Sequence, residues 1–160
     1  MKRRAFLSLL GAVTVSGCSG WHLRGMNETR ALPFKRLAVD ETIAEPALVQ
    51  RLLDQLTQLG VAVDSTVDWR LRLGETRWHV SRTAYTLTGD TAAEALSLKQ
   101  PFEVWYNGTL VLRDEAVVYR DHRIDTNALA AAETERRDLQ DAMRREAVNQ
   151  ILRQLSYLKP

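Results

Sequence analysis

Two stretches of the chain repeat apolar residues at steps of three and four, which is the spacing of an amphipathic helix. The first covers residues 45–60, EPALVQRLLDQLTQLG. Pro46 suits the first helical turn, where its missing N–H leaves no hydrogen bond unmade. Gly60 suits the residue just past the helix end, where a positive φ is needed. We therefore expect a helix that begins near Pro46 and ends just before Gly60.

The second and longer helix is predicted over residues 127–158. Asp125, Thr126 and Asn127 precede it and offer side chains that could cap its first N–H groups. Within this helix, the charge run ETERRDLQDAMRRE at residues 133–146 is typical of a solvated helix face. The apolar residues form a single stripe: Leu139, Met143, Ala147, Val148, Ile151, Leu152, Leu155 and Leu158.

Strands are predicted where the pattern is extended or has a period of two. Trp69, Leu71 and Leu73 alternate with Arg70 and Arg72, as in a strand with one buried face. The expected strands cover residues 36–40, 61–80, 94–106 and 109 to about 121.

Glycine and proline set the expected breaks between these strands. Asn107-Gly108 lies between two apolar runs and predicts a hairpin with a type I′ turn. Pro101 predicts an edge position or a bulge, because it cannot donate to a strand ladder. Gly74 also favours a bulge, and Thr-Gly-Asp within residues 81–92 favours a turn.

The resulting order is β-α-β-β-β-α, which indicates an α+β fold. We expect two helices packed on one face of a mostly antiparallel, mixed sheet of about four strands. Residues 34–160 would form this single α/β domain. Hydrophobic residues make up 45% of the chain and charged residues 26%, as in an ordinary soluble domain.

The first 17 residues have the layout of a secretory signal peptide. A basic start that contains Lys2, Arg3 and Arg4 precedes an apolar run over residues 5–15, and small residues follow. A buried N-terminal helix is the alternative interpretation. The paired arginines also match a twin-arginine export signal, so either export route stays open. Residues 18–33 hold two glycines and a proline and are expected to be a tether.

Val15-Ser16-Gly17-Cys18 resembles the lipobox of bacterial lipoproteins. That resemblance implies cleavage before Cys18, a diacylglycerol on its thiol and an N-acyl chain on the new amine. Several acyl chains anchor a protein stably, whereas one does not. Ser19, rather than aspartate, implies sorting to the outer membrane. An unmodified cysteine after ordinary cleavage is the alternative.

Composition argues against several other functions. The chain has 22 basic and 20 acidic residues, and loss of residues 1–17 would leave 19 basic and 20 acidic residues. The mature net charge near −1 gives no case for nucleic-acid binding. A single cysteine allows no internal disulfide. His22, His79 and His122 lack metal-ligand spacing, so no metal or other cofactor is expected beyond the covalent lipid.

Several stretches, in order, resemble the LPS-assembly lipoprotein LptE family. They cover most of the mature chain: GWHLR at 20–24, QLTQLGV at 55–61, WRLRLGE at 69–75, RTAYTLTGDTAAEA at 82–95, the hairpin strand before its glycine turn, and ETERRDLQDAMRREAVNQILRQL at 133–155. The resemblance implies two helices on a four-stranded sheet. It also implies a non-catalytic lipoprotein on the periplasmic side of the outer membrane. Such a protein plugs and helps to assemble the LptD β-barrel, which inserts lipopolysaccharide into the outer leaflet.

Direct contact with lipopolysaccharide is a further expectation. Arginine binds phosphate through two parallel hydrogen bonds, and lipid A carries phosphates. Arg70, Arg72 and Arg82 are the candidate residues, and solvent-facing strand arginines are the alternative interpretation. Thr88 and residues 130–132 are the positions where a basic contact would be sought, and none of them is basic.

Two rival functions are weighed against this one. An enzyme would need a reactive group, and His79, Ser81 and Asp90 lack the glycine-flanked serine of a nucleophile elbow. An accessory lipoprotein of another envelope transport or secretion system would share the signal, the tether and a small α/β domain. Only an LptE-like protein would require one partner barrel.

Overall fold

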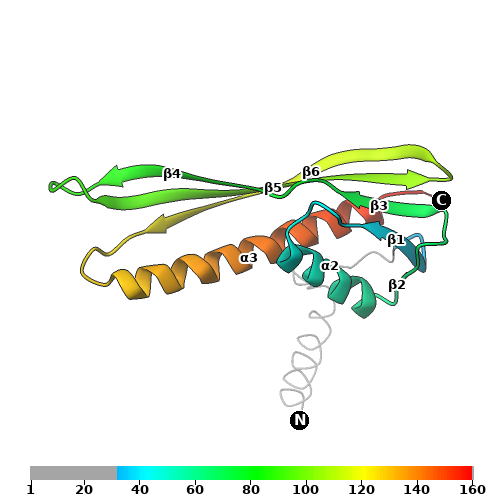
Figure 1. Cartoon of the computed structure of the whole chain (residues 1–160), viewed down its shortest axis with the longest axis horizontal. Helices are drawn as coiled ribbons and strands as arrows, with labels where there is room; N and C mark the ends of the chain where they lie inside the picture. The colour runs from blue at the N-terminus through cyan, green and yellow to red at the C-terminus, as the bar shows by residue number, and fades with distance from the viewer. Residues whose placement is uncertain (1–31, 160) are drawn as a thin grey trace, which may run out of the picture.

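The computed structural model describes residues 32–159, and residues 1–31 and 160 lie outside the described part. A long sheet forms one layer, and two helices form the second layer on one of its faces (Figure 1). The elements in chain order are β1 (Arg36–Asp40), α2 (Pro46–Gln58), β2 (Ala62–Val63), β3 (Trp69–Leu73), β4 (Arg77–Tyr85), β5 (Thr91–Tyr106), β6 (Thr109–Arg123) and α3 (Leu129–Ser156).

The long strand β5 is the spine of the sheet. Antiparallel β6 pairs with it along nearly its whole length on one side. On the other side β4 pairs with the first part of β5 and β3 with the last part, both antiparallel. Strand β1 is parallel to β3 and to β2. The fold is therefore α+β with a mixed sheet, as expected.

The expected number and order of strands were wrong. The sheet has six strands rather than about four, and the order is β-α-β-β-β-β-β-α. The strand expected over residues 61–80 is three separate strands, and β4 continues to Tyr85 in the region where a turn was predicted. The turn is confined to residues 86–90, where Gly89 has a φ of 91° and its N–H bonds the carbonyl of Thr86.

The break between β3 and β4 has a physical cause in β5. Pro101 lies in this central strand, and its carbonyl accepts the N–H of Gly74 at 2.9 Å. A strand residue directs its N–H and C=O to the same side, so the missing proline N–H falls opposite the break. The buried Gln100 side chain bridges the gap, since its amide donates to the carbonyls of Gly74 and Pro101 at 2.8 and 3.0 Å.

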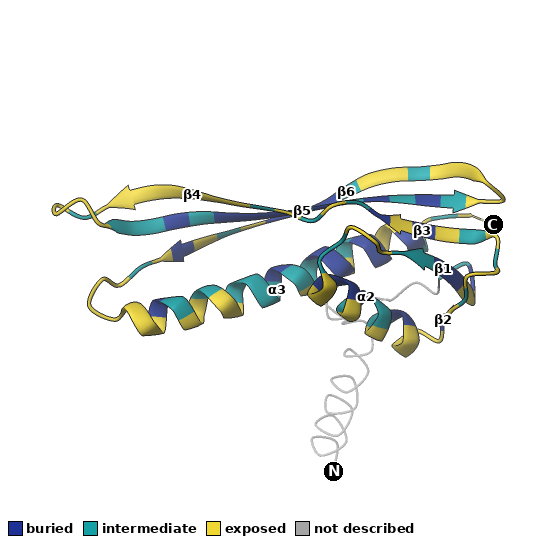
Figure 2. Ribbon diagram, viewed as in Figure 1, coloured by how far each residue is buried: buried dark blue, intermediate teal, exposed yellow. Residues whose placement is uncertain are grey.

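The core lies between the sheet and the helices (Figure 2). The even-numbered residues of β5 from Glu94 to Val104 are buried, which is the period of two expected for a face packed against helices. Both predicted helix stripes pack into the core, with Leu53, Leu139 and Leu158 at its margin. Leu59, the last apolar residue of the first stripe, is exposed. Each fully buried leucine stabilises the fold by roughly 1.5–3 kcal/mol relative to an exposed one.

Local turn signals were mostly correct. Gly60 has a φ of 74°, and the N–H groups of Gly60 and Val61 bond the carbonyls of Thr57 and Leu56, which forms a Schellman motif. Asn107 and Gly108 both have positive φ, as a type I′ turn requires. The predicted caps of α3 were wrong, because the N-cap is Ala128 and no side chain caps the helix. Asp125 instead accepts the N–H of Asn127 within the preceding turn.

Candidate functional site

The sheet face opposite the helices carries a row of alternating charges across four strands. Asp40 on β1 pairs in register with Arg72 on β3, Arg72 with Glu103 on β5, and Glu103 with Arg113 on β6. Residues in register lie on the same face, so these four side chains form one line. We call them the charge ladder.

The ladder is electrically balanced and held together by ion pairs. Arg72 lies 3.4 Å from Asp40, and Arg113 lies 2.7 Å from Glu103. The indole of Trp105 donates to Glu103 at 3.0 Å, and the Arg72 guanidinium lies 5.8 Å from the Trp105 ring centre. These contacts lower the pKa of Glu103, through the Trp105 hydrogen bond first and then through Arg113. The carboxylate therefore stays ionised to a lower pH than an ordinary glutamate does.

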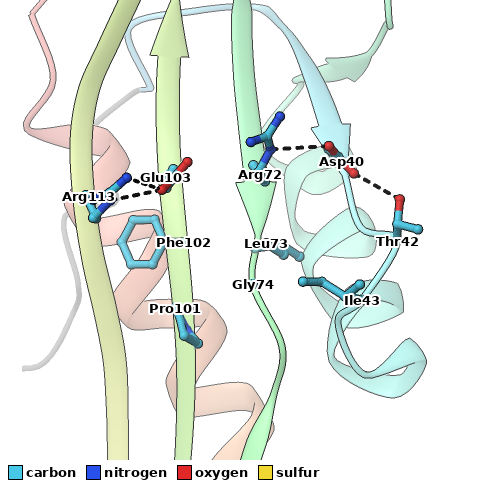
Figure 3. Close-up of a pocket in the computed structure, with 10 residues that line it drawn as sticks. All are labelled: Asp40, Thr42, Ile43, Arg72, Leu73, Gly74, Pro101, Phe102, Glu103 and Arg113. Atoms are coloured by element: carbon cyan, nitrogen blue, oxygen red, sulfur yellow. Dashed lines mark hydrogen bonds and ion pairs between the residues drawn. The ribbon is translucent and has the colours of Figure 1, made fainter.

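A pocket of about 410 Å³ adjoins the ladder. Figure 3 shows it between the β1–α2 loop and strands β3 and β5, with Ile43 on one side and Pro101 on the other. Its lining surface is mainly apolar, with the four ladder residues at its margin. Both arginines already face a carboxylate, so an anion would have to displace an ion pair. The geometry therefore suits a small apolar group better than a phosphate.

The structure separates the three candidate arginines. Arg70 and Arg72 lie on the open face of β3, and the buried Leu71 between them confirms the predicted alternation. Arg82 is on β4 opposite Glu94, which belongs to the helix-facing side of β5. Glu94 is nine positions from the ladder residue Glu103 along β5, or about 30 Å at 3.3 Å per residue. The lipopolysaccharide contacts stay predictions, and Arg82 could not share one phosphate with the other two.

Sequence reasoning missed a polar cluster where the two helices meet the sheet. Arg144 on α3 bonds Glu45 at the start of α2, and Trp78 on β4 donates its indole N–H to the same carboxylate at 3.2 Å. Arg144 also lies over the Trp78 ring at 5.2 Å. No local signal could find the cluster, because its members come from three distant segments. The predicted solvated charge run includes Arg144, which is only 15% exposed.

A second polar group that sequence reasoning missed lies near the start of β5, where β6 pairs with it. His122 is 2% exposed, and its Nδ1 lies 3.1 Å from Glu94. Its Nε2 has no hydrogen-bond partner and lies 3.9 Å from Glu135. Within residues 32–159, no group of His, Cys, Asp or Glu has the arrangement of a metal site. His79 and Ser81 are exposed on one face of β4, while Asp90 bonds Thr86 and Thr88 in the hairpin turn.

The candidate lipid-attachment residue Cys18 lies outside the described residues, as do the signal peptide and most of the tether. In the part of the chain that the structure describes, no helix is both long and apolar enough to cross a membrane.

Comparison with solved structures identifies the fold. Rare lipoprotein B from Shewanella oneidensis matches with a TM-score of 0.66 at 22% identity, covering 76% of this chain and 93% of that one. This chain has an LptE-like lipoprotein fold. A minor lipoprotein from Acinetobacter baumannii matches with a TM-score of 0.65 at 20% identity, covering 81% and 99%. Lipoprotein B from Nitrosomonas europaea matches with a TM-score of 0.66 at 22% identity, covering 86% and 90%.

No protein-family model and no curated protein matches this chain. The LptE-like fold accounts for the two helices on one face of the sheet. It agrees with the architecture that the sequence resemblance implied, apart from the number of strands.

Proposed function

We propose that this protein is an outer-membrane lipoprotein that plugs and helps to assemble a partner β-barrel of the LptD type. In this role it supports the transport and insertion of lipopolysaccharide into the outer leaflet. Its acylated Cys18 would hold it on the periplasmic side, and no catalytic step is assigned to it. One observation carries the proposal: the LptE-like lipoprotein fold extends over three-quarters or more of the chain. The lipobox and the ordered resemblance to LptE support it.

The open face of the sheet is chemically suited to a plug. The interior of a large membrane barrel is polar. A surface that enters it must not bring unpaired charges out of water, because an unpaired buried charge is costly. The ladder supplies two carboxylates and two guanidiniums that already pair with each other. The ladder can therefore meet a polar wall without leaving any of its own four charges unpaired.

Co-purification tests the proposal. The full chain with a C-terminal tag would be expressed in a Gram-negative host and purified from detergent-solubilised outer membranes, and its partners identified by mass spectrometry. We expect a near-stoichiometric large β-barrel. Cys18→Ala is the matched control for the anchor and should leave the outer-membrane fraction. Recovery of the protein by itself, or with inner-membrane transporter subunits, would instead favour an accessory role in another envelope system.

Direct binding of lipopolysaccharide is a separable part of the proposal. Because Arg82 lies far from Arg70 and Arg72, the alanine variants should act independently on binding to purified lipopolysaccharide. We expect the effect of Arg82→Ala to add to that of Arg72→Ala in a double variant. Unchanged binding in all the variants would remove these arginines as contacts and leave the plug role intact.

A further inference from the structure

The two long edges of the sheet differ in how their backbone is protected. A free edge strand presents unpaired N–H and C=O groups, and proteins usually block them. On the β6 edge, side chains bond the outward-facing backbone groups of three alternate residues. The N–H of Glu115 bonds Asp114 at 2.8 Å, and the carbonyl of Tyr119 bonds Arg120 at 2.7 Å. The N–H and the carbonyl of Val117 both bond Gln150, each at 3.1 Å.

The β4 edge has no such protection. Among the elements of residues 32–159, the backbone of β4 lies close to β5 only. Six successive residues, from Arg77 to Arg82, pair with β5 in regular register. Within the described chain, no side chain bonds the backbone of this segment. The β4 edge is therefore both regular and open.

The direction of the open backbone groups follows from Pro101. Its carbonyl faces the β3–β4 side, so the alternate residues of β5 before it also direct their backbone groups toward β4. Their partners Arg77, His79 and Ser81 are therefore bonded to β5. The residues between them direct N–H and C=O groups outward: Trp78, Val80 and Arg82.

Side chains define what could pair with this edge. Arg77 and His79 lie on the open face of the sheet, where Arg77 already pairs with Glu115 on β6. The whole of β4, RWHVSRTAY, contains no acidic residue. On the helix-facing side Val80 is 43% exposed. The base of the strand is fixed, because the Trp78 indole bonds Glu45 and its ring packs under Arg144. A fixed strand loses little conformational freedom when a partner binds.

We propose that the β4 edge accepts an extended segment of the partner barrel as an added strand. The inference rests on the proposed function and names the surface that the partner uses. The segment would place an acidic side chain beside Arg82, which forms no ion pair within the described residues, and an apolar side chain against Val80. Main-chain hydrogen bonds supply affinity in this mode of recognition, and alternate side chains supply specificity. A second copy of this chain is a poor occupant, because it would bring another cationic strand without acidic residues.

Val80→Pro is the decisive variant. It removes an outward N–H while leaving the β4–β5 ladder intact, since the Val80 N–H is not part of that ladder. We expect the tagged full-length variant to recover at least about tenfold less barrel than the wild type, as a difference of about 1.4 kcal/mol would cause. Val80→Ala keeps the N–H and should retain most of the barrel. Asp121→Pro, an outward position on the β6 edge, is the matched proline control and should behave like the wild type.

Hydrogen exchange gives a second readout on the intact complex. The amides of Val80 and Arg82 should exchange at least roughly tenfold more slowly in the complex than in the free protein. If wild type and Val80→Pro recover equal barrel and these amides are not protected, the edge inference is wrong and the plug role stands. Equal losses in both proline variants would also overturn it. If the wild type recovers no barrel, the proposed function itself fails.

Discussion

The guanidinium of Arg144 donates two hydrogen bonds to one carboxylate oxygen of Glu45, at 3.2 and 2.7 Å, although the two residues are 99 positions apart. Their side chains are only 15% and 24% exposed. The hydrogen bonding of Arg144 to the Glu45 carboxylate is the main reason why the pKa of Arg144 is raised. Because Trp78 contacts both residues, the pair joins α2, β4 and α3 in one cluster.

Arg144→Ala should lower the free energy of unfolding by about 2 kcal/mol, because it leaves a partly buried carboxylate without its main partner. Glu45→Ala should cost a similar amount. The double variant should cost less than the sum, since each change removes the same interaction. Urea unfolding of the four proteins measures this coupling. Arg145→Ala, at the exposed neighbour, should change stability by no more than about 0.5 kcal/mol.

Gln150→Ala should destabilise the protein by about 1–2 kcal/mol. Its amide group bonds both the N–H and the C=O of Val117, and both would lose their partner. The variant should also aggregate more readily, because it opens part of the β6 edge. Asn149→Ala removes an exposed amide from the next residue and is the control. Equal aggregation of the two variants in light-scattering assays would contradict the capping role.

Gly74→Ala should destabilise the fold by about 1 kcal/mol. A Cβ at this position would lie 3.1 Å from the Cβ of Pro101, and a proline ring in a central strand has little room to move. The urea midpoint should fall, with Glu75→Ala as the neighbouring control. An unchanged midpoint would show that the β3–β4 break relaxes to admit a methyl group.

Acid should destabilise the wild type partly through Glu103. Its pKa in the folded protein is lowered from the ordinary value of 4.5. A lowered pKa stabilises the folded state above pH 4.5, and this contribution is lost as the pH falls below that value. Glu103→Gln should therefore have a flatter dependence of stability on pH below 4.5. Asp64 and Glu133, whose pKa values are also lowered, should keep some of the slope. Identical slopes for wild type and variant would contradict this assignment.

Local signals predicted the elements that depend on neighbours in sequence. The α2 helix, its end at Gly60 and the Asn107-Gly108 turn follow from periodicity and from backbone preferences, and the structure confirms them. The caps of α3 failed, because Asp125 bonds the turn before the helix instead of the helix itself. Three polar residues in a row supplied several competing hydrogen bonds, and a local pattern does not choose among them.

The division of residues 61–80 was decided by the tertiary structure. Gly74 and Pro101 each indicated an irregularity, yet nothing in their spacing shows that they face each other across two strands. Only when β3 and β4 pair with the same side of β5 does the missing N–H of Pro101 fall at the break. The expected bulge therefore became the boundary between two strands.

The amino-acid pattern by itself determined the two helices with their apolar stripes and the turns at Gly60 and Asn107-Gly108, because these depend on residues within a few positions of one another. It also carried the lipobox and the ordered LptE resemblance. The tertiary structure decided the charge ladder, the Glu45–Arg144 cluster, the separation of Arg82 from Arg72, and the contrast between a capped and an open sheet edge. Each of these depends on strand register and on contacts between distant segments, which a pattern of neighbouring residues does not encode.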